Sequence, residues 1–344
     1  MDVVRTTAKR TASMKDVARH AAVGLGTVSN VVNDLATVAP ELRARVLESV
    51  HELGFVRNEA ARHLRSGTSR TVVLLVPDSG NPFFTEISRG AGEVVWAEGR
   101  FPLIASAHGD ASRENAYLGS FDSMRVHGLL ASPVGDVSLA LARLRTRGIP
   151  TVLVDARPPS DTYSAVRTDH VAGGCLATAH LLSSGRQRVD FLSTPAVVPQ
   201  IADRIAGAKT AFRVHGLDPN SLGVWYSGGP APSSGASVVE RILALPRAER
   251  PEGFVVSNDV LAIEVMHAML REGIRIPDDI AVVGYDDIPW AEAAAIPLSS
   301  VRQQSVEMGA IAARVLLDQI TDEDAPREDC ILAPELIVRE SSAA

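Results

Sequence analysis

Aromatic residues and cysteines are scarce in this chain of 344 residues, and long apolar runs are missing. Phe, Trp and Tyr make up 4% of the sequence, so Val, Leu, Ile and Ala must fill any core. Cys175 and Cys330 stand far apart in apolar surroundings, which predicts buried free thiols rather than a disulfide framework or a metal site. No apolar run approaches the roughly 20 residues that span a membrane, and the N-terminus lacks a signal-peptide core. We therefore expect a cytoplasmic protein.

The short motifs of common enzyme classes are also missing. No G-x-G-x-x-G follows a strand, because Val95 stands where Gly90 and Gly92 would need a third glycine. Neither a P-loop nor a G-x-S-x-G occurs, and no nucleophile has His and Asp partners at a recognisable spacing. We expect no catalytic residue, no metal and no cofactor, and hence a protein that is not an enzyme.

Charge is unevenly distributed along the chain. The formal net charge is -7, which does not suit a protein that coats nucleic acid nonspecifically. Residues 1–70, however, carry a balance of +4, and the remaining residues carry −11. A basic head on an acidic body suits a small module that faces phosphates, attached to a larger domain.

The stretch 14–33 reads as two short helices joined by a tight turn. Ser13 and Asp16 form a capping box for the first helix, and Gly24 gives the turn its backbone freedom. In the second helix Val28, Val31 and Val32 face inward. The outward residues are small or amide-bearing, so they can enter a groove and hydrogen-bond to bases or phosphates. This is the helix-turn-helix pattern, and the alternative is an ordinary helical hairpin. The outward residues are Leu25, Gly26, Thr27, Ser29, Asn30 and Asn33.

A third helix from Pro40 to Leu53, ended by Gly54, completes a compact head. Residues 1–12 are polar, and we expect them to be disordered. Asn58 can cap a very short helix over 59–65, which is too short to be stable alone. A flexible segment rich in Ser and Gly follows that helix.

The segments KDVARHAAV, TVSNVVN and VRNEAARHLRS together resemble the LacI/GalR family of bacterial transcription regulators. The resemblance extends over essentially the whole chain. It implies that residues 58–65 form a hinge helix that orders on DNA, with Leu64 as a wedge between base pairs and Arg65 beside it. The alternative is a solvated linker with a stray leucine. With Lys15 and the outward residues of the second helix, Leu64 and Arg65 complete the predicted DNA-binding set.

From Thr71 onward, apolar strand-like runs, among them 71–77 and 101–107, alternate with helical patterns, which predicts an α/β protein with parallel sheets. The predicted helices lie at 84–98, 170–183, 201–214, 260–271 and 306–320. A break near 163–169 suggests two lobes. The resemblance implies a doubly wound, periplasmic-binding-protein-like domain in which the chain crosses between the lobes more than once. The predicted domains are a tail at 1–12, the helix-turn-helix head at 13–57, a hinge helix and linker at 58–70, and an effector-binding and dimerisation domain at 71–344. Its N-terminal lobe is expected at about 71–167 and 299–322, and its C-terminal lobe at about 168–298 and 327–344.

Ligands in such folds lie beyond the carboxyl ends of the strands, here between the lobes. Carboxylates and an arginine there can hold sugar hydroxyls, and a phenylalanine can stack on an apolar sugar face. Each candidate also has a structural explanation, as a helix cap or a core residue. The predicted effector-binding residues, which match the family's ligand positions, are Asp78, Phe83, Phe84, Asp155, Arg204, Asn258, Asp286 and Gln303.

The sequence departs from the family's pattern at several positions. Gly24 replaces a capping Ser or Thr, which weakens the cap by a few tenths of a kcal/mol. Leu25 and Gly26 give the start of the second helix little hydrogen-bonding capacity. Pro230 falls where several relatives place an aromatic wall on the ligand, and Trp290 is the candidate substitute.

We therefore predict a homodimeric DNA-binding regulator, most simply a repressor, that binds a palindromic operator. A small molecule, expected to be a sugar, would change its operator affinity. The alternative is a sugar-binding protein or sugar-processing enzyme with a vestigial head. The salt dependence of elution from heparin distinguishes the two.

Overall fold

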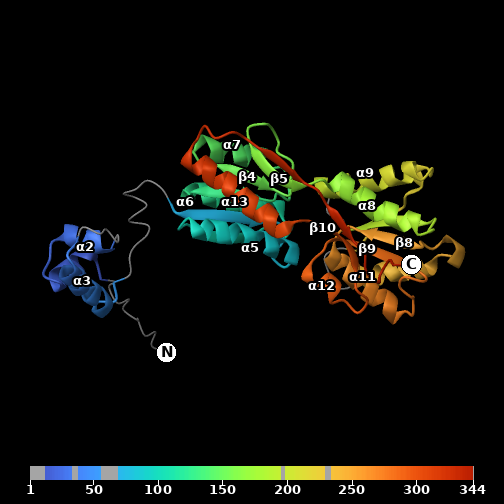
Figure 1. Ribbon diagram of the computed structural model, residues 1–344, viewed down its shortest axis with the longest axis horizontal. Coiled ribbons are helices and arrows are strands. Elements are labelled where there is room, and N and C mark those ends of the chain that lie inside the picture. The colour runs from blue at the N-terminus through green and yellow to red at the C-terminus, as the bar shows by residue number, and fades with distance from the viewer. Residues whose placement is uncertain (1–11, 33–37, 56–68, 195–197, 229–233, 344) are drawn as a thin grey trace, which may run out of the picture. The chain divides into compact units, whose positions relative to one another are not determined.

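The computed structural model describes residues 12–32, 38–55, 69–194, 198–228 and 234–343. The chain divides into two compact units, Met1–Thr68 and Ser69–Ala344 (Figure 1). Apart from residue 12, the predicted N-terminal tail lies outside the described residues, and so does the predicted hinge helix at 58–65.

The described residues of the first unit form a bundle of three short helices around a small apolar core. The buried core residues of this unit are Val17, Ala18, Ala21, Val28, Val31 and Val46, one set from each helix. The predicted third helix begins at Pro40 as expected, and Gly54 follows its end with a φ of 59°. The helices are α1 (Met14–His20), α2 (Leu25–Val32) and α3 (Pro40–Glu52).

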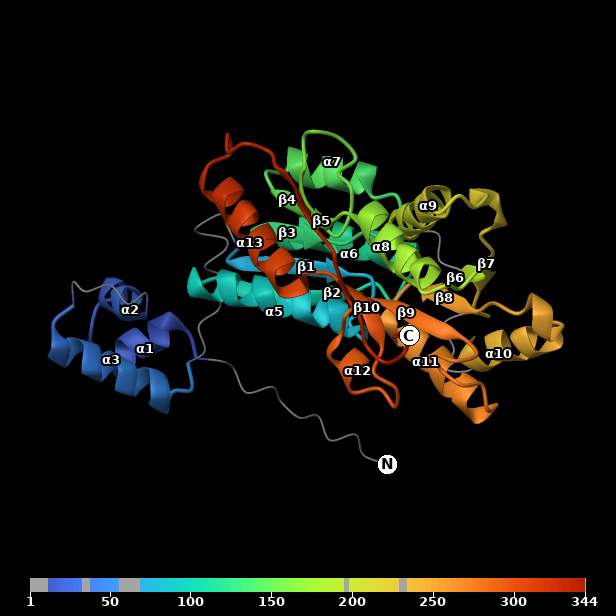
Figure 2. The ribbon, with the colours of Figure 1, turned by 45° about the vertical axis from the view of Figure 1, so that its right-hand side comes forward.

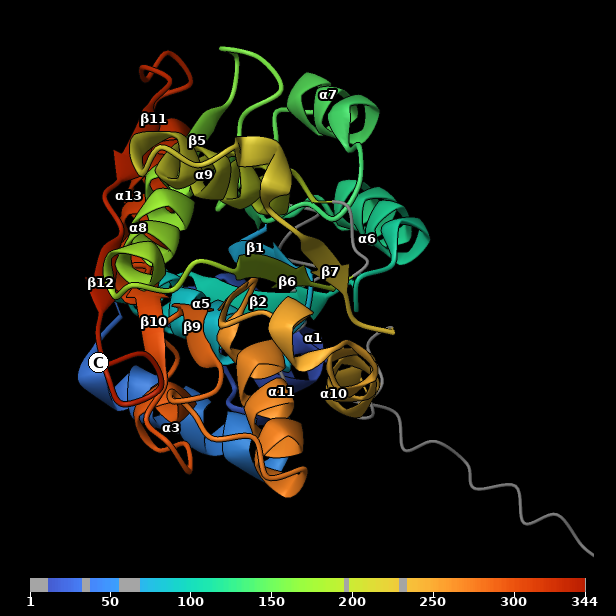
Figure 3. The ribbon, with the colours of Figure 1, turned by 90° about the vertical axis from the view of Figure 1, so that its right-hand side faces the viewer.

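The second unit contains two six-stranded sheets, each with helices on both faces (Figure 3). The strand orders are β11-β5-β4-β3-β1-β2 and β12-β10-β9-β8-β6-β7. Every pairing between the described strands is parallel except that of β10 with β12. The predicted α/β, doubly wound architecture is confirmed.

The first lobe is the sheet that contains β1, together with its helices. Alternate residues of β1 point to opposite faces: Val72 and Leu74 pack under α5 and α13, while Val73 and Leu75 pack under α6 and α7. Figure 2 shows α13 lying along α5 on one face. The elements are β1 (Thr71–Val76), α5 (Pro82–Ala97), β2 (Phe101–Ser106), α6 (Ala111–Met124), β3 (Gly128–Ala131), α7 (Ser138–Thr146), β4 (Thr151–Val154), β5 (Ser164–Thr168), α13 (Ser305–Thr321) and β11 (Asp329–Leu332).

The second lobe is built in the same way. Phe191 and Val283 pack under α8 and α9, and Leu192 and Val282 pack under α10 and α11. The elements are α8 (His170–Ser183), β6 (Val189–Ser193), α9 (Pro199–Val214), η1 (Pro219–Ser221), β7 (Val224–Tyr226), α10 (Ser234–Ala244), η2 (Arg247–Glu249), β8 (Gly253–Val256), α11 (Asp259–Arg271), β9 (Ala281–Asp286), α12 (Pro289–Glu292), β10 (Ser299–Arg302) and β12 (Glu335–Ile337).

The predicted lobe boundaries near the C-terminus are wrong in detail. β10 was expected to start the return to the first lobe, but it pairs with β9 in the second sheet. β11 was assigned to the second lobe, but it pairs with β5 in the first. The chain therefore crosses between the lobes after Thr168, after Arg302 and after Leu332. Short strands carry too little apolar pattern to reveal which sheet completes its edge with them.

Two further predictions concern buried side chains. Cys175 and Cys330 are free thiols as expected, but both are half-buried rather than buried. The apolar run at 101–107 is one of the predicted strands. It forms β2 at the edge of the first sheet, where Phe101, Leu103 and Ile104 are exposed.

Candidate functional sites

The turn between α1 and α2 sets the angle of the helix-turn-helix. The predicted capping box is present: the Asp16 amide donates to Ser13 Oγ over 3.3 Å, and the Ser13 amide donates to Asp16 Oδ2 over 2.9 Å. The left-handed residue of the turn, however, is Ala22, with a φ of 50°, and not Gly24 as the sequence suggested. The carbonyl of Gly24 instead accepts the first amides of α2, from Thr27 and Val28.

An arginine that sequence reasoning missed supports this turn. Arg45 of α3 donates from Nη2 to the carbonyl oxygens of Ala21 and Ala22, over 2.7 and 3.2 Å. These carbonyls end α1, where the helix leaves acceptors without partners in its own backbone. Arg45 thereby fixes the geometry that presents α2.

The outward face of α2 carries most of the predicted DNA-binding residues. Leu25 and Gly26 are exposed, and Thr27, Ser29 and Asn30 are half-exposed. Lys15 of α1 is also exposed. The buried Val28 and Val31 hold this face outward. The remaining predicted DNA-binding residues, Asn33, Leu64 and Arg65, lie outside the described residues.

The predicted effector site begins where β4 and β9 end. Asp155 follows β4 with a φ of 52°, and Asp286 ends β9 with a φ of 110°. Asp is one of the few side chains that tolerates positive φ, although the value at Asp286 carries strain. The turns place both carboxyl groups in buried positions at the carboxyl edges of the two sheets. The structure thus brings together Asp155 and Asp286, which are 131 residues apart in the sequence.

A histidine joins these two carboxylate regions. His170, the first residue of α8, lies 2.8 Å from Asp155 Oδ1 through Nε2. Arg204 Nε donates to His170 Nδ1 over 3.3 Å, and the Tyr285 hydroxyl lies 3.2 Å from the same nitrogen. Arg204 also lies over the Tyr285 ring, with its guanidinium carbon 3.7 Å from the ring centroid. All four side chains are buried.

Asp286 is the other end of this network. Gln303 Nε2 donates to Asp286 Oδ1 over 2.8 Å, and Arg204 Nη2 lies 4.0 Å from the same oxygen. Burial raises the pKa of Asp286 to about 7, against the opposing effect of Arg204 and Gln303. Four predicted effector residues, Asp155, Arg204, Asp286 and Gln303, therefore meet in one buried polar network.

The other predicted effector residues have structural contacts of their own. Asn258 caps α11 by accepting from the Leu261 amide over 2.9 Å, and exposed Asp78 accepts from the Gly80 amide over 2.8 Å. Phe83 is buried in the core of the first lobe, and Phe84 packs against that core. Any contact of these residues with a ligand stays a prediction.

Sequence reasoning missed His170 and Tyr285. Tyr285 precedes Asp286 inside an apolar strand and looks like a core residue; its burial raises the pKa of the phenol. His170 opens a helix, a position with no distinctive spacing to Asp155 or Arg204. The one available signal was a histidine beside the break at 163–169, where the chain changes lobe.

A cavity of about 370 Å³ lies between the lobes beside this network. Its walls include residues 133–138 and 155–157 of the first lobe, and Pro199, Gln200 and Asp203 of α9. Among the predicted effector residues only Asp155 lines it, next to His170. Arg157 closes one side by donating to Asp203 Oδ2 from Nε and Nη2, over 3.1 and 2.9 Å. The predicted substitute for an aromatic wall, Trp290, is exposed and does not line this cavity, and Pro230 lies outside the described residues.

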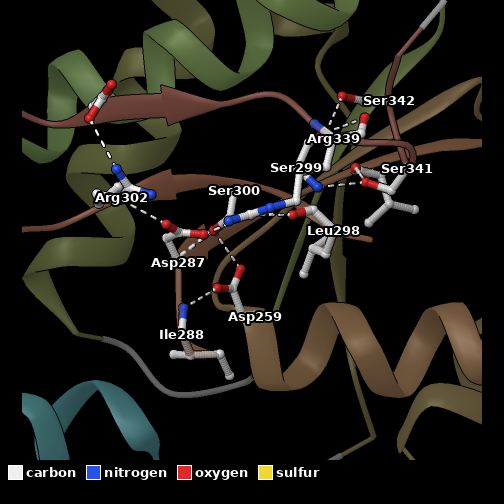
Figure 4. Close-up of polar contacts among 12 residues, drawn as sticks. Asp259, Asp287, Ile288, Leu298, Ser299, Ser300, Arg302, Arg339, Ser341 and Ser342 are labelled. Atoms are coloured by element: carbon white, nitrogen blue, oxygen red, sulfur yellow. Dashed lines mark hydrogen bonds and ion pairs between the residues drawn. The ribbon is translucent and has the colours of Figure 1, made fainter. Parts of the chain in front are cut away.

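A second polar cluster surrounds Asp287, the residue after Asp286 in the sequence, and anchors the C-terminal segment (Figure 4). Asp287 accepts from Arg302 Nε over 2.8 Å and from Arg339 Nη1 over 2.7 Å. Asp259 accepts from Ser300 Oγ over 2.6 Å and is fully buried, which raises its pKa well above the ordinary value; the Asp286 charge adds to this. These contacts fix the turn that holds Asp286.

No helix in the described part of the chain combines the length and the apolar composition that crossing a membrane requires.

Comparison with known proteins gives the following matches. Residues 13–58 match the model for bacterial regulatory proteins of the lacI family, and residues 178–342 match the periplasmic binding protein-like domain. The chain is 32% identical over 333 residues to the HTH-type transcriptional repressor PurR of Aliivibrio fischeri (strain MJ11), covering 96% of this chain and 98% of the relative. The chain belongs to the LacI family of bacterial regulatory proteins.

Other LacI-family relatives agree with this. The ribose operon repressor of Escherichia coli (strain K12) is 30% identical over 334 residues, covering 96% of this chain and all of the relative. A LacI family transcriptional regulator from Enterococcus faecium, solved with bound ribose, is 27% identical, with a TM-score of 0.73 over 79% of this chain and 98% of that chain. This LacI-family chain is accordingly a transcriptional repressor and not an enzyme.

Proposed function

We propose that this repressor binds a nearly palindromic operator as a homodimer, and that a sugar bound between its lobes changes its operator affinity. The observation that carries the proposal is the combination on one chain of an exposed α2 face with a buried interlobe network beside a cavity. A repressor that binds an operator acts in the cytoplasm, where the bacterial DNA lies.

The DNA-binding half of the proposal rests on the chemistry of α2. Asn30 carries an amide that can pair with an adenine edge, and Leu25 can contact a thymine methyl group. Thr27 and Ser29 offer hydroxyls for phosphates. A base-reading residue affects specific sites only, whereas a phosphate contact affects all sequences.

Selection of bound fragments from genomic DNA, followed by fluorescence anisotropy, tests this half. Asn30→Ala should lose about 1–3 kcal/mol on the selected site and change its base preference. Glu48→Ala, an exposed position on α3, serves as a control that keeps the preference. If Asn30→Ala bound every sequence as the parent does, the assignment of Asn30 would fail. If the parent selected no DNA sequence and its elution from heparin did not depend on salt, the result would support the alternative, a sugar-binding protein or enzyme with a vestigial DNA-binding head.

The effector half rests on the interlobe network and on the relatives. Asp155, Asp286 and Gln303 offer oxygens that accept hydroxyl groups, and Arg204 offers donors. The cavity has the size of a small-molecule site. One relative is named a ribose operon repressor, and the crystal structure of another contains bound ribose. A screen of pentoses and hexoses for a rise in melting temperature, with D-ribose first, identifies the effector because a ligand stabilises the state it binds.

A further inference from the structure

Three of the predicted effector residues already have partners within the protein itself. Arg204, Asp286 and Asp155 are at most 6% exposed, and each has a partner within the network. The cavity beside the network touches His170 and Asp155 but not Arg204 or Asp286. His170 and its bond to Asp155 therefore stand between the cavity and the inner part of the site.

The bond between His170 and Asp155 joins the two lobes. Asp155 ends a strand of the first sheet, whereas His170 begins a helix that covers the second. Gln200 of α9 adds a bond to the Asp155 carbonyl, and Arg157 adds the pair with Asp203. The pair of Arg157 with Asp203 is partly exposed and the Gln200 contact is half-buried, so of these three contacts the one at His170 is the least exposed to competing water.

The donors around His170 define its role. Arg204 Nε can only donate, so His170 Nδ1 accepts and carries no proton. Nε2 then carries the proton and donates to the Asp155 carboxylate. The imidazole thus presents a donor to one lobe and an acceptor to an arginine of the other.

Three glycines build this position. A side chain at Gly173 would overlap the Tyr285 hydroxyl, one at Gly174 would overlap the Arg204 carbonyl, and one at Gly207 would overlap the Val171 carbonyl. The helices α8 and α9 consequently approach closely enough to set His170 against Arg204. A larger residue at any of these three glycines would push the two helices apart and disturb the contact between His170 and Arg204.

We propose that His170 is an internal ligand that holds the lobes closed, and that an effector acts by taking its place between Asp155 and Arg204. The second clause rests on the function proposed above. The replacing group must donate to a carboxylate and accept from a guanidinium, which a vicinal diol of a sugar does through two neighbouring hydroxyls. Among the described residues that line the cavity none is Phe, Tyr or Trp, so a sugar fits better than a ligand that needs stacking.

The lobe distance can be measured directly by pulsed electron resonance on the full chain. Spin labels at Leu139 on α7 and Val214 on α9, which are 79% and 76% exposed, report on the two lobes after Cys175→Ala and Cys330→Ala. His170→Ala should shift the distance distribution to longer values. Added imidazole should restore the parent distribution, because it supplies both the N–H and the acceptor. N-methylimidazole lacks the N–H and should not restore it.

Operator affinity gives the second readout. His170→Ala should weaken operator binding at least about fivefold, the lower range of allosteric coupling, and imidazole should reverse the loss. His180→Ala is the matched control, since His180 lies on the same helix and bonds to Ser342 within the second lobe. If His170→Ala is too unstable to label, His170→Leu keeps the volume without the hydrogen bonds and should show the same longer distances.

Several results would overturn the proposal. Unchanged label distances in both His170 variants would show that other contacts close the lobes. Equal restoration by imidazole and N-methylimidazole would show that His170 only fills space. Failure of the parent to bind any operator would contradict the proposed function. The label distances need no DNA, so they would still test whether His170 holds the lobes closed.

Discussion

Asp286 is a buried carboxyl group whose protonation should affect stability. Its pKa is raised from 3.8 to about 7 by burial, so between these values the folded chain binds more protons than the unfolded chain. Stability from this group is therefore greatest at low pH and falls as the pH rises toward 7, by at most about 1.4 kcal/mol per pH unit.

Asp286→Asn should remove this contribution while keeping a side chain that tolerates positive φ. Urea unfolding of parent and variant between pH 4.5 and 7.5 measures the difference. The variant should lose less stability than the parent as pH rises. Asp78→Asn, at an exposed carboxyl group, should leave the parent's slope unchanged. Identical slopes for the parent and Asp286→Asn would contradict the burial argument.

At the scale of residues, the sequence predicts the carboxylates at the ends of strands, Asp155 and Asp286. It does not predict His170, which connects them. Asp155, Asp286 and Arg204 are charged side chains next to apolar runs, so their position at a sheet edge follows from the fold class. His170 acquires its role through a contact with Tyr285, 115 residues away, and through the close packing of α8 on α9. Nothing in local spacing records that contact.

Among the described elements, β2 forms an exposed and largely apolar edge of the first sheet. Phe101, Leu103 and Ile104 are 47%, 41% and 53% exposed, and Trp96 at the end of α5 contacts Phe101 edge to face. We infer that this edge is an association surface, because an exposed apolar edge strand readily pairs with another chain. A second copy of this chain fits it best, because a two-fold dimer would present two helix-turn-helix units to one operator.

Ile104→Lys should therefore convert the proposed homodimer to monomer in sedimentation velocity and weaken operator binding by at least tenfold. A charge buried at an interface without a partner costs several kcal/mol, so the effect should be large. Leu139→Lys, at an exposed residue of α7, should leave the dimer intact. A dimer that persisted in Ile104→Lys at micromolar concentration would place the interface elsewhere.

The elements that the sequence predicted are the ones with strong apolar periodicity. α8 was predicted at its observed bounds, and α5, α9, α11 and α13 within two residues of theirs. The sequence pattern predicts a break where β5 lies, because Ser164, Arg167 and Thr168 interrupt its apolar residues. β11 and β12 are short, with exposed and half-buried residues, so their pattern does not separate them from loops.

For the whole molecule, the helix-turn-helix unit and the lobes must be coupled if a ligand is to change operator affinity. The first unit has a core of a few small residues, and the cavity lies between the lobes of the second unit. Ligand binding there can change DNA affinity only through the angle between the lobes and the segment that connects the two units. Coupling of this kind is worth about 1–3 kcal/mol, or about 5–150-fold in operator affinity.

Removal of a ligand contact should abolish this response and spare the DNA-binding unit. Asp286→Gly removes the carboxyl group, suits the positive φ, and leaves the contact between His170 and Asp155 in place. We expect the variant to bind operator as the parent does and to show less than a twofold change with the sugar that most stabilises the parent. Asp278→Gly, at an exposed carboxylate of the same lobe, should keep the full response. A folded Asp286→Gly protein that lost operator binding, or that responded fully, would move the effector site away from Asp286.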